Sequence, residues 1–446
     1  MNQFKGKKVL IFGLGLNQGG VGSSKFFAKQ GAIVRITDLK ATRILKPSLD
    51  QLKQFKNIEY SLGQHKYADV TWADLIIKNP AVKPGNLYIE YAKKKNKPVK
   101  MDMDIFLEYV KPFQLIGITG TKGKSTTASL IYEILRSAQD EVNVIFAGNI
   151  GKSVLDTIPH VKKETLVILE ISSFQLESFE AHKVSPKYAV ITNIYQDHLN
   201  YYKNMDEYIY AKKIIGKDQT KDDFLFIRKG DPVADKPRFL KAFKGKIIRF
   251  SKEDLPKNFK SYLLGEHNRQ NLAAAYALVK AFGLDAKVIL AKLSQFKGIP
   301  FRMELIKVWY GVKIINDTTA TGPDAGAQAI KTFPGCILIA GGMNKGLDYT
   351  KYATIVAKNV KKVFFLEGDA TNTILSSLRP RAKRGGSNLE IHGPYNNLEK
   401  LLTDIKEGTG PGDTILFSPA ATSFNLFQNE FDRGTKFNQA VQKVFG

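Results

Sequence analysis

The chain has 446 residues, of which 43% are hydrophobic and 24% are charged, and its formal net charge is +25. A prior of about 150 residues per domain predicts about three domains, each able to bury its own core. The single cysteine, Cys336, excludes an internal disulfide, and no apolar run approaches the ~18 residues that cross a bilayer, so we expect a cytoplasmic protein without membrane insertion.

The positive charge is scattered in short clusters such as Lys93–Lys95, Lys162–Lys163 and Arg379–Arg384. No recognition helix, zinc-ligand spacing or aromatic-rich RNA-binding pattern accompanies them. We therefore interpret most of these lysines as solvated surface charge and expect no nucleic-acid partner, although the charge can help to attract an anionic small substrate.

The first predicted elements are the strand Val9–Phe12, the glycine loop Gly13–Gly22, a helix to about Gln30, and the strand Ala32–Thr37 that ends at Asp38. This order is typical of a Rossmann half, in which glycines approach a pyrophosphate and an acid approaches a sugar or base. A glutamine replaces the third glycine of the dinucleotide fingerprint. The pattern thus favours a nucleotide other than NAD(P), and a purely structural turn stays an alternative.

The second segment opens with a variant phosphate loop. Leu115–Ile118 is a buried strand, a turn through Gly120 and Gly123 follows, and a helix continues to Arg136. Glycines let backbone N–H groups wrap a phosphate, and the helix presents its positive end to the same anion. In the standard pattern the position of Ile118 would be a glycine, so the loop departs from the common form. Just after the loop, Lys124 can reach the outer phosphates, and Ser125 or Thr126 can offer a hydroxyl to Mg²⁺.

Further strands of the second segment are predicted at Val142–Phe146, Leu166–Leu169, Tyr188–Thr192, Asp223–Ile227 and Lys246–Phe250.

Polar residues follow two of these strands. Glu170 ends one, and an acid at that place in a phosphate-loop enzyme can hold Mg²⁺ directly or through water. The next strand delivers Asp197 and His198 to the same sheet edge. Tyr208–Ile215 is predicted to be a helix whose Lys212 and Lys213, judged from the residues alone, are surface charges.

The third segment has predicted strands at Val312–Ile315, Cys336–Ala340, Val363–Leu366 and Asp413–Phe417. Polar residues follow three of them, in Asn316–Thr321, in the turn before Lys345 and in Ser418–Phe424. Ligands of open α/β sheets bind outside such carboxyl ends, and a lysine near a helix N-terminus suits an anionic second substrate such as an amino acid.

With these motifs in place, the chain resembles the Mur ligase family, in particular its D-glutamate-adding branch. The resemblance covers nearly the whole length and rests on Gly117–Thr126, Gly148–Gly151, Glu170–Leu176, Gly265–Asn271 and Arg302. It implies an α/β fold of three domains: a Rossmann-like UDP-substrate-binding domain at 1–112, a central ATP-binding domain with a mainly parallel sheet at 113–298, and a Rossmann-like amino-acid-binding domain at 299–446. The missing glycine at Ile118 is then a family trait.

The resemblance also implies a reaction. ATP phosphorylates the carboxylate of UDP-N-acetylmuramoyl-L-alanine, D-glutamate attacks the acyl phosphate, and ADP and phosphate are released, as a cytoplasmic step of peptidoglycan precursor synthesis. It implies two Mg²⁺ ions, with Mn²⁺ as a possible substitute, and a CO₂-derived carbamate on Lys212, which replaces the surface interpretation of that lysine. We expect a monomer.

Site residues are carried over by position. For ATP they are Gly120, Thr121, Lys122, Gly123, Lys124, Ser125, Thr126, Asn268, Asn271, Arg302 and Asp317. For the UDP substrate they are Gly13, Leu14, Gly15, Leu16, Asp38 and Asn149. For the amino acid they are Thr321, Lys345, Ser423 and Phe424. For metal they are Ser125, Glu170, His198 and the Lys212 carbamate, and Lys124, His198 and Lys212 are the expected catalytic residues.

Some residues depart from the family pattern. The first glycine loop is longer than usual, Thr319 stands where a lysine is common, and Glu430-Phe431 inverts a Phe-Glu order. These changes leave open whether the added amino acid is D-glutamate, so a related ligase with another amino acid or acceptor is the alternative. A nucleic-acid-stimulated ATPase and an NAD-dependent dehydrogenase are more distant alternatives, and folylpolyglutamate synthetases lack the preceding Rossmann-like domain.

Overall fold

The structure is a computed structural model that describes residues 3–16, 18–138, 143–148, 153–199, 201–263, 265–344, 346–384, 389–423 and 426–446, with the backbone alone at Gln18 and at 379–384. The chain divides into two compact units, one of residues 1–260 and 266–294 and the other of 261–265 and 295–446. Within the described residues, no helix is long and apolar enough to cross a membrane.

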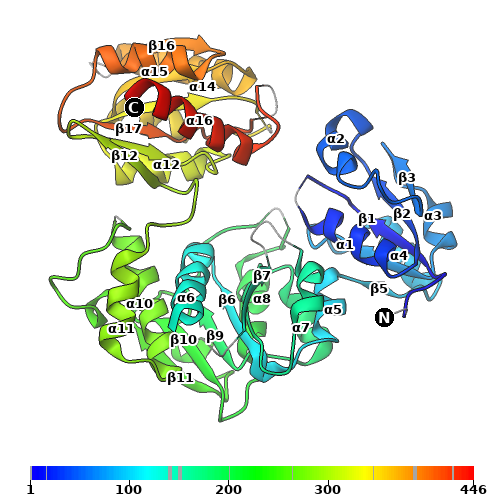
Figure 1. The fold of residues 1–446 in the computed structure, drawn as a ribbon. Helices are drawn as coiled ribbons and strands as arrows, with labels where there is room; N and C mark the ends of the chain where they lie inside the picture. The colour runs from blue at the N-terminus through cyan, green and yellow to red at the C-terminus, as the bar shows by residue number, and fades with distance from the viewer. Residues whose placement is uncertain are drawn as a thin grey trace. The chain divides into compact units, whose positions relative to one another are not determined.

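The described residues form three β-sheets, and all are mainly or wholly parallel (Figure 1). The α/β class expected from the sequence is therefore confirmed. One sheet falls within each of the ranges 1–112, 113–298 and 299–446, whose boundaries stay a prediction.

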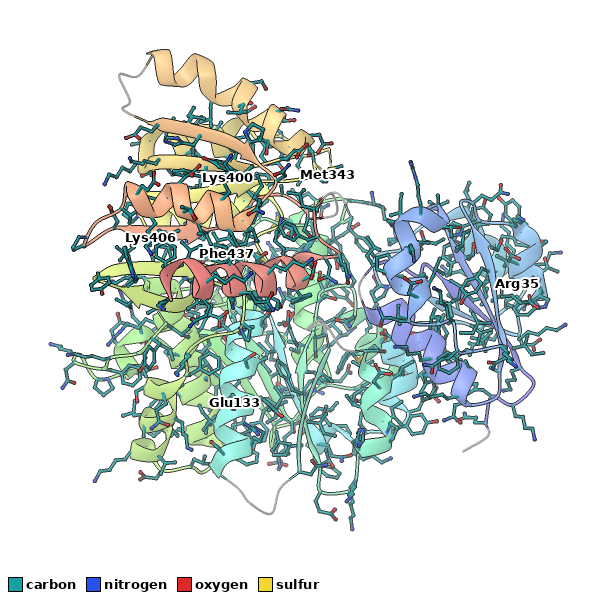
Figure 2. All side chains as sticks on the ribbon, turned by 45° about the horizontal axis from the view of Figure 1, so that its top comes forward. Arg35, Glu133, Met343, Lys400, Lys406 and Phe437 are labelled. Atoms are coloured by element: carbon teal, nitrogen blue, oxygen red, sulfur yellow. The ribbon has the colours of Figure 1, made fainter. Side chains whose placement is uncertain are left out.

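The first sheet has the order β3-β2-β1-β4-β5, with all pairs parallel. Its strands are β1 (Lys8–Phe12), β2 (Ile33–Asp38), β3 (Ile58–Leu62), β4 (Leu75–Lys78) and β5 (Val99–Lys100). Its helices are α1 (Gln18–Lys29), α2 (Thr42–Asp50), α3 (Tyr67–Trp72), α4 (Leu87–Lys94) and α5 (Asp102–Leu107). The central strand β1 is buried on both faces after Lys8, which explains its unbroken apolar run. On β2, Arg35 (labelled in Figure 2) pairs with Glu59 at 2.7 Å and lies over the Trp72 ring.

The predicted glycine loop is shorter than expected. Helix α1 already begins at Gln18, so the prediction of a loop through Gly22 was wrong. Gly20 and Gly22 lie in this helix. Glycine is needed at both positions for close packing and not for a loop conformation. A Cβ at Gly20 would overlap the Leu14 carbonyl, and one at Gly22 would overlap the Ser153 side chain.

The second sheet is parallel throughout and has the order β11-β10-β9-β6-β8-β7. Its strands are β6 (Leu115–Thr119), β7 (Val144–Gly148), β8 (Leu166–Glu170), β9 (Tyr188–Ile191), β10 (Phe224–Arg228) and β11 (Lys246–Phe250). Its α-helices are α6 (Lys124–Ala138), α7 (Leu176–His182), α8 (Met205–Lys217), α9 (Pro237–Leu240), α10 (Glu266–Ala281) and α11 (Ala286–Gln295). Short 3₁₀ turns are η1 (Pro112–Gln114), η2 (Val154–His160) and η3 (Lys252–Asp254).

The third sheet has the order β12-β13-β17-β14-β15-β16, and only its edge pair β12–β13 is antiparallel within the described residues. Its strands are β12 (Glu304–Trp309), β13 (Val312–Asn316), β14 (Cys336–Gly341), β15 (Val360–Leu366), β16 (Glu390–Tyr395) and β17 (Thr414–Phe417). Its helices are α12 (Pro323–Thr332), α13 (Thr350–Asn359), α14 (Asp369–Arg384), α15 (Leu398–Glu407) and α16 (Glu430–Phe445).

Alternating strand residues supply two separate cores to this sheet. Leu338 and Leu416 belong to the core that includes α12, α13 and α14, whereas Ile337 and Ile415 belong to the core that includes α15 and α16. Phe437 of α16 (labelled in Figure 2) stacks on the Phe417 ring in the second core, with 4.2 Å between the ring centroids. Helices therefore cover both faces, as a doubly wound sheet requires.

Candidate active site

The phosphate loop joins the buried strand β6 to helix α6. Gly120 and Gly123 have φ angles of +144° and +84°, a region in which side chains are disfavoured. Lys124 opens α6, and its Nζ donates hydrogen bonds to the carbonyls of Gly120 and Thr121 at 3.0 and 3.1 Å. The lysine side chain thus folds back over the loop, where it can meet a bound phosphate.

A second segment, directly after β9, fixes the conformation of the loop. Asn193 accepts a hydrogen bond from the Lys122 N–H and donates one to the Lys122 carbonyl, both at 2.9 Å. Thr192 donates to the same carbonyl at 2.6 Å, and the Thr121 N–H donates to the Asn193 carbonyl at 2.9 Å. Asn193 and Thr192 were not predicted from the sequence, because their importance depends on the adjacency of β9 and β6.

Helix α10 meets the loop at Asn271. A Cβ added to Gly123 would overlap Asn271 Oδ1, so the two groups lie in close contact. Asn271 Nδ2 also donates to Asn268 Oδ1 at 3.2 Å, which brings two residues of the expected ATP set together beside the loop.

We expect Gly123→Ala to weaken both stability and nucleotide binding, because the new Cβ would meet Asn271 and would also require a left-handed backbone. Gly230→Ala is a matched control, since Gly230 has a φ of +73° and open space around its Cβ position. The control should lose only about 1 kcal/mol of unfolding free energy from backbone strain. Denaturant unfolding and binding of a non-hydrolysable ATP analogue measure both effects. Equal losses in the two variants would show that the Asn271 contact is unimportant.

Lys212 lies on the inner side of α8. Its side chain is buried, and its Nζ contacts Thr119 Oγ1 at 3.1 Å and the Gly120 carbonyl at 3.0 Å. The surface location inferred from the residues alone was therefore wrong. Burial, reinforced by the nearby charge of Lys124, holds the pKa of Lys212 well below its usual value. The lowered pKa makes the neutral, nucleophilic form of this amine more accessible than that of an exposed lysine.

Glu170 ends β8, the strand beside β6, and pairs in register with Ile118. It is buried, and no described residue donates a hydrogen bond to its Oε2. A buried carboxylate oxygen without a donor is costly unless a cation fills its coordination, so Glu170 fits a metal ligand. Ser125, buried at the start of α6, adds an oxygen of the type that Mg²⁺ prefers.

His198 follows β9 in a left-handed conformation with a φ of +55°. Its ring contacts Phe174 edge-on at 5.0 Å and lies 5.9 Å from the Tyr208 ring. Burial and the positive charges of Lys212, Lys124 and Lys122 lower the pKa of His198, although Asp197 opposes them, so the neutral ring that can bind a metal is favoured. Across the described part of the chain, no three His, Cys, Asp or Glu side chains gather as a metal cluster, so any metal here depends on mixed ligands.

The first domain holds the expected UDP-substrate loop. Gly13 and Gly15 have φ angles of +96° and +64°, Leu14 is buried and Leu16 is partly buried. The Asp38 carboxylate accepts hydrogen bonds from the N–H groups of Gly15 at 2.9 Å and Lys40 at 2.8 Å. Asp38 therefore shapes this loop. Asn149 lies outside the described residues.

The second unit carries the remaining expected residues of the ATP site. Asp317 follows β13, accepts from Ser418 Oγ at 2.8 Å and from the Met303 N–H at 3.1 Å, and is buried. Burial raises the pKa of Asp317 to about 7, so this carboxyl carries a proton more readily than an exposed one. Arg302 is exposed, and its positive charge opposes that shift.

Two of the four residues expected to bind the amino-acid substrate are described in the second unit. Thr321 is partly buried, and Ser423 is buried with no hydrogen-bond partner for its Oγ among the described residues. Lys345 and Phe424 lie outside the described residues. Thr319, which replaces the family lysine, donates to the Phe301 carbonyl at 2.8 Å. Phe431 is 50% exposed and packs edge-on against Phe301 at 6.2 Å.

Sequence reasoning also missed Arg433, which is fully buried in α16. Its guanidinium donates to Thr318 Oγ1 and to the Thr318 carbonyl, both at 2.8 Å, and to the Ala421 carbonyl at 3.1 Å. These bonds fix the loops that carry Asp317 and Ser423. Composition could not reveal this role, because arginine is normally a surface residue.

Two family models and two curated relatives that match this chain carry Mur ligase names. Residues 7–100 match the "Mur ligase MurD-like, N-terminal domain" family, and residues 118–260 match the "Mur ligase middle domain" family. The chain is 33% identical to a UDP-N-acetylmuramoylalanine–D-glutamate ligase of Roseiflexus sp. (strain RS-1), over 99% of each protein. It is 36% identical to the enzyme of that name from Borreliella afzelii (strain PKo), over 100% of this chain and 99% of the other.

Solved structures share the fold at lower identity. The chain resembles UDP-N-acetylmuramate-alanine ligase MurC from Thermotoga maritima with a TM-score of 0.62 and 19% identity, over 98% of this chain and 99% of that one. It also resembles MurF ligase from Thermotoga maritima in complex with ADP, with a TM-score of 0.53 and 15% identity, over 99% and 100%.

Proposed function

Because the chain belongs to the Mur ligase family, we propose that it is an ATP-dependent ligase that joins D-glutamate to UDP-N-acetylmuramoyl-L-alanine in peptidoglycan precursor synthesis. Full-length relatives with this named activity support the choice of substrates. Within the site, the observation that carries the proposal is the buried Lys212 amine, which contacts the Gly120 carbonyl of the phosphate loop and whose pKa is lowered by burial. A simple ATPase has no evident use for such a group.

The reaction has two steps. A carboxylate oxygen of the UDP-linked alanine attacks the γ-phosphorus of ATP, and the bond to ADP breaks, which leaves an acyl phosphate. The glutamate nitrogen then attacks the acyl carbon, loses a proton, and expels inorganic phosphate. Activation is needed because a carboxylate is a poor electrophile, and most of the catalysis comes from positioning and charge neutralisation.

The residues of the first unit bind and orient the phosphates. The Thr121 and Lys122 N–H groups are held by Asn193, so the anion would face the positive end of α6, and Lys124 would add a mobile positive charge to the transferred phosphoryl group. Ser125, Glu170 and His198 would hold Mg²⁺. When bound, Mg²⁺ neutralises phosphate charge and screens the approach of one anion to another.

Lys212 would take up CO₂. Its neutral nitrogen attacks the carbon of CO₂, an N–C bond forms, and one proton leaves, so the amine becomes an anionic carbamate. Low pKa and burial favour this step because they supply the unprotonated nitrogen and exclude competing water. The carbamate would then complete the oxygen ligands that Glu170 begins.

The other substrates are assigned to the remaining expected residues. Gly13–Leu16 and Asp38 would contact the UDP portion, together with Asn149. Asn268, Asn271, Arg302 and Asp317 would complete the ATP site. Thr321, Lys345, Ser423 and Phe424 would hold the amino acid, and the unpartnered Ser423 hydroxyl supports this assignment. We further propose that the protein is cytoplasmic, because ATP and nucleotide-linked precursors are cytoplasmic compounds, and that it acts as a monomer.

A direct assay tests the proposal. Purified protein is mixed with Mg²⁺, ATP and UDP-N-acetylmuramoyl-L-alanine, and single amino acids are added while phosphate release and product mass are followed. We expect one product, formed only with D-glutamate. A product with a different amino acid would instead support the alternative ligase suggested by Thr319 and Glu430-Phe431. If no amino acid yields a product, the assignment is wrong.

A further inference from the structure

A polar network joins the first domain to the segment that carries His198. Glu177, in the first turn of α7, accepts from Lys78 Nζ at 3.1 Å through one carboxylate oxygen and from Tyr201 Oη at 2.9 Å through the other. The Tyr201 hydroxyl also reaches the Val82 carbonyl of the first domain at 3.5 Å. One carboxylate thus connects three segments that are far apart in sequence.

The network reaches the backbone of His198 through Tyr201. The N–H groups of Tyr201 and Tyr202 donate to the His198 carbonyl at 2.9 and 3.0 Å. The Tyr201 ring packs on Phe174 at 4.3 Å, and Phe174 in turn contacts the His198 ring. His198 has a left-handed backbone, which a non-glycine residue keeps only where its surroundings hold it.

The other end of the network lies beside the expected UDP-substrate loop. Lys78 ends β4 and pairs in register with Phe12, the residue directly before Gly13. The Lys78 side chain is 17% exposed and that of Glu177 is 36% exposed, so the lysine end of this ion pair is partly shielded from solvent. A change in the position of the first domain would therefore move Lys78 and alter its ion pair with Glu177.

We propose that Glu177 is a positioning residue that holds the His198 turn through Tyr201, and that Lys78 makes this position depend on the first domain. The inference deepens the proposed function, because it assumes that His198 serves the metal site. Binding of the UDP substrate to the loop beside Lys78 would then favour the metal-binding arrangement of His198, so that the two sites are coupled.

Amide hydrogen exchange in the full-length protein tests the network without requiring activity. We expect Glu177→Gln and Lys78→Met each to speed exchange at the Tyr201 and Tyr202 amides by about tenfold. The double variant should exchange no faster than Glu177→Gln, because both changes break the same connection. Unchanged exchange at these amides in both single variants would overturn the inference.

The same helix provides a matched control. Glu180, one turn after Glu177, accepts hydrogen bonds from another tyrosine and lysine, Tyr210 and Lys217, but both lie on α8, and among the described residues neither is bonded to the His198 turn. Glu180→Gln should leave exchange at Tyr201 and Tyr202 unchanged. An equal effect in Glu180→Gln would mean that loss of any α7 carboxylate loosens the region, and the specific role of Glu177 would be refuted.

Metal binding supplies a second measurement. With a non-hydrolysable ATP analogue present, Glu177→Gln should raise the half-saturating Mn²⁺ concentration about tenfold. Loss of a residue that supports a metal ligand commonly has an effect of this size. Unchanged Mn²⁺ binding together with faster exchange would refute the metal role of the network. The proposed function is judged separately, by the D-glutamate-dependent product of the wild-type protein.

Discussion

Replacing Lys212 with alanine is expected to reduce kcat by about a thousandfold, as does the loss of other preorganised charges at reacting centres. The Lys212 amine is buried and contacts Thr119 Oγ1 and the Gly120 carbonyl. Lys124 also reaches that carbonyl, but it opens α6 and its Nζ extends to Thr121 instead of Thr119. Without it, the carbamate oxygen ligands cannot form. A short carboxylic acid such as acetate should restore part of the activity, because it can place a carboxylate in the vacated space.

Two further measurements separate the carbamate from a structural role of Lys212. Labelled ¹³C-bicarbonate should give a carbamate signal in the NMR spectrum of the wild-type protein and none in Lys212→Ala. Lys212→Met, which keeps the packing against Tyr208, should have the unfolding free energy of the wild-type protein and yet be as inactive as the alanine variant. Lys213→Ala is the control, since Lys213 is only partly buried and lies over the Phe239 ring. Full activity of unaided Lys212→Ala would refute the carbamate.

Lys212 also shows where sequence reasoning stops. The residue pattern correctly predicted a helix at Tyr208–Ile215, which lies within α8. The inner face of this helix could not be identified, because lysine is normally exposed. Only the packing of α8 against β6 and β9 decides that Lys212 points inward. The family resemblance supplied a role for this residue that the chemistry of an isolated lysine did not suggest.

The strands that were predicted are those with continuous apolar runs, such as β6 and β17, which lie inside parallel sheets. Strand β4 was missed although its residues 75–77 are apolar and buried. Strands β3, β5, β12 and β16 were missed because they lie at sheet edges and are partly exposed. Their sequences therefore mix polar and apolar residues without a clear period. The same limit applies to Gly20 and Gly22, whose close packing depends on partners distant in sequence.

The candidate site follows a similar division. Lys124, Ser125 and Glu170 were predictable because each follows a recognisable strand or loop, and parallel strands bring such ends to one edge. The supports of the site, Asn193 and Arg433, could not be predicted. Their hydrogen bonds join segments whose adjacency only the fold determines.

Replacing Lys124 with alanine is the second change with a large expected effect. Its ammonium crosses the phosphate loop to the carbonyls of Gly120 and Thr121, and it is positioned to follow the transferred phosphoryl group. Loss of this charge should lower kcat by about a thousandfold or more, since phosphoryl transfer depends chiefly on such stabilisation. Single-turnover formation of ADP measures the chemical step directly.

A neighbouring lysine, Lys122, provides the matched control for this prediction. Lys122 belongs to the same loop, but its side chain is 72% exposed and pairs with Asp197 at 3.4 Å. Lys122 belongs to the expected ATP loop through its backbone, which is hydrogen-bonded to Asn193, and exposed ion pairs contribute little, so Lys122→Ala should keep kcat within about twofold of the wild-type value. Binding of the ATP analogue should weaken far less than kcat in Lys124→Ala, because the lysine acts mainly on charge that develops during transfer. Near-normal turnover in Lys124→Ala, or equal losses in both variants, would mean that the loop backbone and α6 alone stabilise the phosphates.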